Sequence, residues 1–169
     1  MTGNSVESAG LPRTLEDIKE LAAEFSRVLK DIRATTALPN GSAWYPYESM
    51  ANIWTLGDLL GDDFVDLLGE LPGKRILDIG AADGDLSFFL ERFAVHSTII
   101  DNPTTNMNGL MGARALKQLL RSGVKIFEAD LDQQFSLPDG SYDLVLFLGI
   151  LYHLKNPYYV LERLALQAR

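Results

Sequence analysis

The sequence has no cysteine among its 169 residues, which excludes a disulfide framework, a thiolate metal site and a cysteine nucleophile. A chain without disulfides fits a cytoplasmic protein, and that is the location we expect. No stretch of about 20 residues is apolar throughout, as a membrane-spanning helix would require. The N-terminus carries neither a basic nor an apolar segment, so the sequence predicts no secretory signal peptide.

Positive charge is also scarce, because 15 lysine and arginine residues stand against 23 aspartate and glutamate residues, a formal net charge of -8. Binding along a nucleic acid or an anionic membrane needs clustered basic side chains, and here they are scattered. Arg114, Lys117 and Arg121 could form a local patch on one helix, but a solvated helix face is the simpler interpretation. We therefore expect no membrane partner, and the charge does not support RNA as a partner.

What the sequence does contain begins with a helical extension, which we place at residues 1–72. Apolar residues recur at spacings of three and four over residues 15–32, which predicts one amphipathic helix packed against the rest of the chain. Two prolines and an Asn-Gly pair predict a loop over residues 38–48. Further helical stretches are expected around residues 49–60 and 62–68.

The predicted loop carries three aromatic residues within four positions, Trp44, Tyr45 and Tyr47, which is unusual for a plain linker. They could line a substrate or cofactor pocket. They could equally fasten the loop to the domain, because aromatic side chains contribute much packing energy wherever they lie. Both interpretations stay open.

Residues 73–169 form the second predicted part, in which short apolar segments alternate with amphipathic ones. The predicted strands cover residues 75–79, 96–100, 124–128 and 142–148, and the predicted helices cover 85–93 and 106–121, with a last helix from Asn156 and Pro157. Such alternation, with nearly continuous apolar strands, predicts a parallel sheet covered on both faces. The fold class is therefore α/β, with a doubly wound, Rossmann-like sheet.

Acidic residues recur where three of these strands end, at Asp78, Asp101 and Asp130. The carboxyl-terminal ends of parallel strands share one edge of a sheet, so these carboxylates should converge with the glycine loop at residues 80–84. Simpler structural explanations exist as well. Asp78 could cap the loop that follows it, and Asp101 could be a turn residue.

The glycine loop could serve a dinucleotide or S-adenosylmethionine. A dinucleotide fingerprint needs glycine where Ala82 stands, so that the backbone can approach a pyrophosphate. Asp83 and Asp85 would also stand near the phosphates, and like charges about 4 Å apart in a partly shielded site repel by roughly 4 kcal/mol. We therefore expect a cationic ligand without phosphate. Both aspartates could instead be helix-capping acids.

This loop resembles the first motif of the class I S-adenosylmethionine-dependent methyltransferase family, which is an acidic residue followed by glycines at alternate positions. Asp78, Gly80, Ala82 and Gly84 match the motif, and Ala82 is its one departure from glycine. The resemblance implies S-adenosyl-L-methionine as the cofactor. It also implies that these four residues and Ala81 contact that cofactor.

The resemblance continues along the chain. Asp101 is similar to the family's acidic residue after the second strand, which accepts hydrogen bonds from both ribose hydroxyls, and the resemblance adds Asn102 beside it. Asp130 and Leu131 resemble the position after the third strand, where a carboxylate receives the adenine amino group and an apolar neighbour flanks the ring. Gly149, after the fourth strand, completes the expected cofactor contacts.

The segment after the fourth strand lies where the resemblance places the transferred methyl group. Its Leu-Tyr-His sequence is similar to the branch of the family that includes enzymes modifying wobble uridine in transfer RNA. His153 is the candidate base for a hydroxyl or amine acceptor, because histidine exchanges protons near neutral pH. His153 could instead orient other groups, and Tyr152 could line the methyl site or cover the core. No cluster has metal-ligand spacing, so we expect no metal.

The sequence thus predicts a methyltransferase acting on a small-molecule or nucleoside acceptor. A complete sheet of the resembled family has seven strands, and only four are predicted here. We therefore expect a fragment of a longer enzyme, or a homo-oligomer formed through the N-terminal helix or the edge of the fourth strand. The alternative function is a protein that binds the cofactor without turnover, and an NAD-dependent oxidoreductase is a third.

Overall fold

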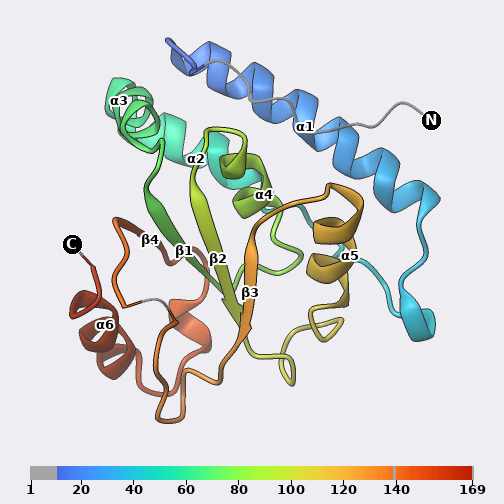
Figure 1. The fold of residues 1–169 in the computed structure, drawn as a ribbon, viewed down its shortest axis with the longest axis vertical. Helices are drawn as coiled ribbons and strands as arrows, with labels where there is room; N and C mark the ends of the chain where they lie inside the picture. The colour runs from blue at the N-terminus through green and yellow to red at the C-terminus, as the bar shows by residue number, and fades with distance from the viewer. Residues whose placement is uncertain (1–10, 139, 169) are drawn as a thin grey trace.

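A four-stranded parallel sheet forms the centre of the molecule (Figure 1), in a computed structural model that describes residues 11–138 and 140–168. The strands are β1 (Arg75–Ile79), β2 (His96–Asp101), β3 (Lys125–Glu128) and β4 (Leu144–Leu146). Their order is β3-β2-β1-β4, with β1 paired to both β2 and β4. The predicted α/β fold with a Rossmann-like parallel sheet is confirmed.

Six α-helices and two short 3-10 helices surround the sheet within the described residues. The α-helices are α1 (Leu15–Thr35), α2 (Ala51–Leu60), α3 (Asp62–Glu70), α4 (Asp85–Glu91), α5 (Met111–Leu119) and α6 (Pro157–Ala165). The 3-10 helices are η1 (Pro39–Gly41) and η2 (Leu151–His153). Local sequence explains where two helices begin. Thr14 and Asp17 form a capping box at α1, and the Asn156 side chain caps α6, whose first residue is proline.

The two faces of the sheet belong to two hydrophobic clusters, because successive side chains of a strand point to opposite sides. Ile76 and Ile99 lie in the larger cluster with buried side chains of α1 to α5. Leu77 and Ile100 lie in the second cluster, where α6 supplies Val160 and a further leucine. The predicted helical extension therefore shares a core with the sheet, and a domain boundary at residue 72 stays a prediction.

The helix predicted at residues 106–121 is shorter than expected, because it begins at Met111. Its predicted first turn is taken up by the Asn106 side chain, whose oxygen accepts hydrogen bonds from the backbone N–H groups of residues 108 and 110. Gly109 and Leu110 then adopt left-handed backbone angles, with φ of 61° and 66°. Asparagine readily competes for backbone groups in this way, so a turn replaces the expected helical start.

The strand predicted at residues 142–148 pairs with β1 only over Leu144–Leu146. Before it, the Tyr142 N–H donates to the carbonyl oxygen of Gln167 at 2.8 Å, and Tyr142 forms a parallel bridge with Ala168. After it, Gly149 has a left-handed φ of 71°, which turns the chain toward η2. The other strands agree with prediction to within one residue at either end.

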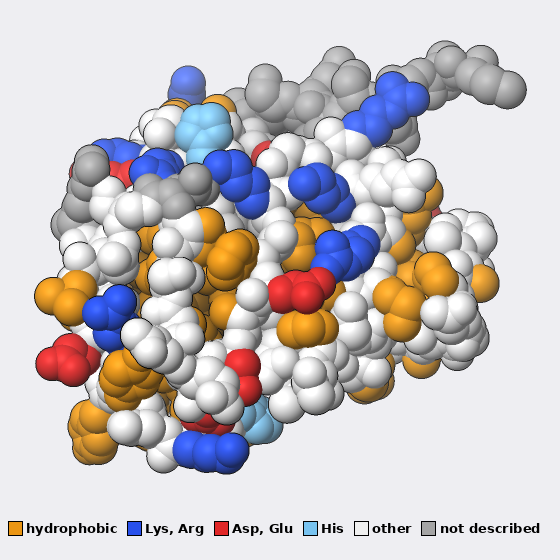
Figure 2. Space-filling model, turned by 60° about the horizontal axis from the view of Figure 1, so that its bottom comes forward, with side chains coloured by type: hydrophobic (Ala, Val, Ile, Leu, Met, Phe, Trp, Pro, Cys, Tyr) orange, Lys and Arg blue, Asp and Glu red, His pale blue; other side chains and the backbone are white. Residues whose placement is uncertain are grey.

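Large apolar side chains reach the surface at the carboxyl-terminal elements, on η2, on α6 and after it. They are Leu151, Tyr152, Tyr158, Leu161 and Leu166. Figure 2 shows one face of the molecule, on which hydrophobic side chains are exposed between charged ones. Of the described helices, none combines the length and the apolar composition needed to cross a membrane. Residues 1–10 of the predicted extension lie outside the described part of the chain.

Candidate functional site

A cavity of about 590 Å³ lies at the carboxyl-terminal edge of the sheet, the edge at which open α/β sheets bind ligands. Five segments line it: the loop before α2 with the start of that helix, and the segments that follow β1, β2, β3 and β4. Its volume is that of an ordinary small-molecule site. Every predicted site residue except Gly84 lies in the lining.

The loop after β1 presents its backbone to this cavity through three small residues, Gly80, Ala81 and Ala82. Gly80 has a left-handed φ of 69°, and its N–H donates to the carbonyl oxygen of Ile100 at 2.9 Å. A Cβ at this position would lie 2.8 Å from Cδ1 of Ile150, so glycine makes room for the segment after β4. The loop therefore brings polar backbone groups close to a ligand.

Gly84 does not line the cavity, contrary to the expected cofactor contact. Its φ is 84°, and a Cβ there would lie 2.5 Å from Cδ1 of Ile99 and 3.0 Å from Cε2 of Phe88. Ile99 belongs to β2 and Phe88 to α4. This glycine lets the helix pack closely on the sheet, which is a structural role.

Asp78 is buried within β1 and lines the floor of the cavity. The Ser87 hydroxyl donates a hydrogen bond to its Oδ2 at 2.8 Å. Burial raises the pKa of Asp78 to about 7, the Ser87 hydrogen bond opposes this rise, and the Asp101 charge adds to it. The carboxyl group therefore titrates near neutral pH and is easily ionised by a nearby cation.

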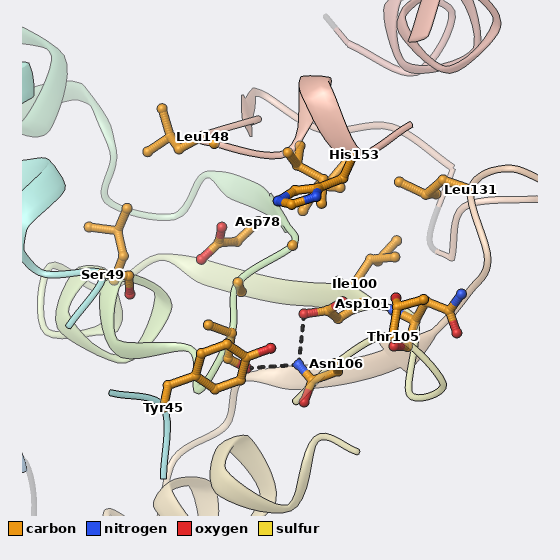
Figure 3. Close-up of a pocket in the computed structure, with 18 of the residues that line it drawn as sticks. Tyr45, Ser49, Asp78, Ile100, Asp101, Thr105, Asn106, Leu131, Leu148 and His153 are labelled. Atoms are coloured by element: carbon orange, nitrogen blue, oxygen red, sulfur yellow. Dashed lines mark hydrogen bonds between the residues drawn. The ribbon is translucent and has the colours of Figure 1, made fainter. Parts of the chain in front are cut away.

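Asp101 ends β2 and is held in place by neighbouring donors (Figure 3). The Asn106 side-chain amide donates to Oδ2 of Asp101 at 2.9 Å and to the carbonyl oxygen of Ala82 at 3.5 Å. The backbone N–H of Asn102 donates to Oδ1 at 2.8 Å. Burial raises the pKa of Asp101, while these hydrogen bonds act in the opposite direction. Asn106 thus ties the carboxylate to the glycine loop.

The segment after β3 adds two carboxylates and an apolar side chain to the lining. The Asp132 N–H donates to Oδ1 of Asp130 at 3.0 Å. Asp132 in turn accepts a hydrogen bond from the backbone N–H of Lys155 at 2.8 Å, which connects this segment to the one after β4. Leu131 lies between the two aspartates and is almost fully buried.

The segment after β4 places two rings at the mouth of the cavity. Tyr152 and His153 belong to η2, both are exposed, and their ring centroids lie 4.2 Å apart. Gly149 precedes them and also lines the cavity. In the view of Figure 3, Asp78 and Asp101 lie between His153 and Tyr45. The two rings are therefore available to a molecule that enters the site.

Asp83 and Asp85 do not face the cavity, and the expectation that their charges would repel a phosphate is wrong. Both are buried and turn toward Arg33 of α1, whose Nη2 lies 3.4 Å from Oδ2 of Asp83 and 2.5 Å from Oδ1 of Asp85. Asp83 also accepts hydrogen bonds from the Tyr45 N–H at 3.0 Å and the Asn108 amide at 2.8 Å. These two charges fasten the aromatic loop and α1 to the glycine loop.

The sequence left open whether the three aromatic residues of the loop line a pocket or fasten the loop to the domain, and the structure shows both roles. Trp44 packs against the larger hydrophobic cluster, and its Nε1 donates to the carbonyl oxygen of Thr36 at 2.9 Å. Tyr45 and Tyr47 line the cavity, with ring centroids 5.3 Å apart in an edge-on arrangement. The Tyr45 hydroxyl accepts a hydrogen bond from the Met107 N–H at 2.9 Å.

Several lining residues were missed from the sequence. They are Glu48, Ser49, Ala51 and Asn52 around the start of α2, Thr105 and Asn106 after β2, and Asp132 after β3. A run of turn-forming residues from Asn102 to Asn106 was the available clue to the second group. In the described part of the chain, no three histidine, aspartate or glutamate residues are grouped in a way that could hold a metal ion.

Comparison with known proteins identifies relatives of this chain. The sequence profile of the family described as "Methyltransferase domain" matches residues 77–166, which is more than half of the chain. A curated relative, the ubiquinone biosynthesis O-methyltransferase of Aeromonas salmonicida, is 34% identical over 108 residues. That match covers 64% of this chain but 44% of the relative, so this chain spans less than half of that protein's length.

Solved structures of similar fold share little sequence with the chain. An S-adenosylmethionine-dependent methyltransferase from Aquifex aeolicus has a TM-score of 0.52 at 19% identity, covering 68% of this chain and 62% of that one. Magnesium protoporphyrin IX methyltransferase from Synechocystis, with S-adenosylhomocysteine bound, has a TM-score of 0.51 at 20% identity, covering 91% and 66%. At these identities the likeness concerns the fold.

Proposed function

Because the chain belongs to the class I S-adenosylmethionine-dependent methyltransferase family, we propose that it transfers a methyl group to a small-molecule or nucleoside acceptor. S-adenosyl-L-methionine is the cofactor of this family, as the sequence predicted. The observation that carries the proposal is the lining of the cavity, where backbone of a glycine loop meets carboxylates from three strand ends. No lysine or arginine belongs to this lining among the described residues.

The residues present fit the cofactor by charge. S-adenosylmethionine carries a sulfonium, an ammonium and one carboxylate, so it is a net cation, and carboxylates attract a cation. We assign Asp101 to the ribose hydroxyls and Asp130 with Leu131 to the adenine ring. We assign Asp78 and the backbone of residues 80–82 to the methionine end, together with Gly149 after β4. Asn102 and Asn106 keep the Asp101 carboxylate in position.

The bound cofactor supplies an already activated methyl carbon, so the chain's own residues need mainly to position the acceptor and exclude water. We propose His153 as the group that takes the proton of a hydroxyl or amine acceptor. Its place in the cavity lining beside Tyr152 supports this role. A cytoplasmic location, inferred from composition, completes the proposal, and cell fractionation would test it.

Titration calorimetry tests cofactor binding directly. We expect S-adenosylmethionine and S-adenosylhomocysteine to bind and NAD not to bind. Asp101→Ala should weaken cofactor binding at least tenfold, because a hydrogen bond to a charged acceptor contributes about 1.5–3 kcal/mol. Asp66→Ala is the matched control, because Asp66 is exposed on α3 and lies outside the cavity lining.

Binding of NAD in place of S-adenosylmethionine would contradict the assignment. Turnover is measured separately, as S-adenosylhomocysteine formed with a panel of hydroxyl and amine acceptors. Cofactor binding without turnover on any acceptor would favour the alternative, a binding protein that retains the pocket. On any acceptor that is methylated, His153→Ala should lower turnover and leave cofactor affinity unchanged.

A further inference from the structure

The charged side chains that line the cavity are almost all acidic. Its lining contains five carboxylates and, among the residues the structure describes, no lysine or arginine side chain. The five are Glu48, Asp78, Asp101, Asp130 and Asp132. Among the described residues, only Glu48 has a cationic side chain within 4 Å, since Nζ of Lys30 lies 3.5 Å from its Oε1. A ligand in this site therefore experiences a negative field that protein cations do little to cancel.

The cofactor alone does not account for this charge. S-adenosylmethionine contributes one net positive charge, and Asp101, Asp130 and Asp78 suffice for its ribose, its adenine and its methionine end. Glu48 and Asp132 remain, on the loop before α2 and after β3. Lys30 compensates part of the Glu48 charge, whereas Asp132 has no cationic side chain within 4 Å among the described residues, so the acceptor meets an excess of negative charge. An anionic acceptor would be repelled, and a neutral or cationic one would not.

The outer part of the cavity is aromatic on two sides. Tyr45 and Tyr47 come from the loop before α2, and Tyr152 and His153 come from η2. Tyr47 and Tyr152 are 60% and 78% exposed, so each ring keeps surface for a ligand beside its contact with Tyr45 or His153. Burial raises the pKa of Tyr47, and the nearby Tyr152 adds to the rise.

From these two observations we infer that the acceptor is a planar aromatic compound, neutral or cationic, whose ring lies between the tyrosines of the aromatic loop and Tyr152 of η2. Aromatic rings pair favourably edge-on or offset, and a cation adds attraction to the electron-rich ring faces. The inference rests on the proposed function and narrows its acceptor. It predicts that RNA is not the acceptor, because phosphates close to this cavity would be repelled.

Calorimetry on the protein saturated with S-adenosylhomocysteine tests this inference with matched probes. Dopamine, methylcatechol and protocatechuate present similar rings with a positive, a neutral and a negative charge. We expect dopamine and methylcatechol to bind at least tenfold more tightly than protocatechuate. Cyclohexanediol, which lacks a planar ring, should bind at least tenfold more weakly than methylcatechol. The advantage of dopamine over protocatechuate should shrink at high salt.

Substitution of the tyrosines tests where the ring of the acceptor binds. Tyr152→Ala should weaken dopamine binding about tenfold and leave S-adenosylhomocysteine binding unchanged, while Tyr152→Phe should keep the affinity. Tyr47→Ala should behave as Tyr152→Ala does. Tyr158→Ala is the matched control, because Tyr158 is 84% exposed on α6 and lies outside the cavity lining.

The outcomes separate this inference from the proposed function. Failure of S-adenosylhomocysteine to bind would overturn both. Binding of S-adenosylhomocysteine with no binding of dopamine or methylcatechol would overturn the inference alone. Protocatechuate or a short RNA binding as tightly as dopamine would also overturn it, as would an unchanged dopamine affinity in Tyr152→Ala and Tyr47→Ala.

Discussion

Asp78 couples the stability of the protein to pH. Burial raises the pKa of Asp78 to about 7 in the folded state, whereas an unfolded aspartate titrates near 3.9. Between these values the folded protein holds a proton that the unfolded chain has lost. This contribution to stability is therefore complete below about pH 4, is lost as the pH rises through 7, and is constant above that.

Replacing Asp78 by asparagine removes this titration and keeps the shape of the protonated acid. The free energy of unfolding of the wild type, relative to Asp78→Asn, should fall by roughly 1–4 kcal/mol between about pH 4 and pH 8. Urea unfolding at a series of pH values measures it. Asp66→Asn, on the exposed face of α3, is the control and should run parallel to the wild type. Parallel curves for Asp78→Asn would contradict the predicted titration.

Substitution of Gly84 tests how closely α4 packs on β2, provided that backbone strain is separated from the steric clash of the added Cβ. Gly84→Ala places a Cβ 2.5 Å from Ile99 Cδ1 on a backbone with φ of 84°. Gly73→Ala also places an alanine at a positive φ, of 76°, but its Cβ would meet no atom within 4 Å. Gly73→Ala should therefore cost about 1–2 kcal/mol from the positive φ alone. Gly84→Ala should cost about 1–3 kcal/mol more, because overpacking adds to it.

Urea unfolding midpoints of the two variants measure this difference. Equal losses of stability would show that the close approach of α4 to β2 is relaxed at little cost. Cofactor affinity is the second reading, because the resemblance to the family had placed Gly84 among the cofactor contacts. If Gly84→Ala were as stable as the wild type but bound the cofactor more weakly, Gly84 would be a cofactor contact after all.

Some site residues could be predicted from the sequence and others could not, and the reason is the position of each residue relative to the strand ends. Asp101 and Asp130 could be located because they lie at or just after the ends of β2 and β3, and the ends of parallel strands meet at one edge. Asp83 and Asp85 could not be assigned correctly, because their buried cation, Arg33, lies some fifty positions earlier in the chain. Local sequence does not reveal such a distant partner.

At the scale of elements, α1 is joined to the glycine loop by Arg33. This arginine pairs with two buried carboxylates, and its guanidinium lies 5.6 Å from the centre of the Trp44 ring. Arg33→Ala would leave Asp83 and Asp85 buried without a cation, and breaking a buried pair in this way costs about 3–5 kcal/mol. We expect a loss of that order and a loosened aromatic loop.

Arg27→Ala is the matched control, because Arg27 is an exposed residue of the same helix. Urea unfolding gives the stability, and Trp44 fluorescence reports on the loop. Adding Asp83→Asn and Asp85→Asn to Arg33→Ala should recover part of the lost stability, because the uncompensated charges are then gone. If Arg33→Ala is no less stable than Arg27→Ala, the ion pairs contribute little.

The elements themselves were largely predictable where hydrophobic periodicity was long or capping residues were explicit. β1 and the start of α6 agree with the sequence expectation to the residue. α5 was placed too early, because the Asn106 side chain captures backbone N–H groups that a helix would otherwise use. β4 was predicted too long, since apolar residues beyond Leu146 pack without pairing to β1.

At the scale of the whole molecule, the helical extension and the sheet belong to one core. Ile18, Phe25 and Ile53 of the extension lie in the same cluster as Ile76 and Ile99 of the sheet. Removing residues 1–72 would therefore expose part of one sheet face and of the helices on it to water, at a cost of about 25 cal/mol for each Å² of apolar surface. The extension and the sheet should depend on each other for folding.

This dependence predicts a single unfolding transition. Both tryptophans of the chain, Trp44 and Trp54, lie in the extension and pack against the shared core, so their fluorescence follows that part. Amide hydrogen exchange in β1 and β2 follows the sheet. The two probes should give the same free energy of unfolding, and a chain of residues 73–169 alone should lack the dispersed NMR spectrum of a folded protein. A sheet that stays protected after the tryptophan signal is lost, or a folded fragment 73–169, would instead establish two independent domains with a boundary near residue 72.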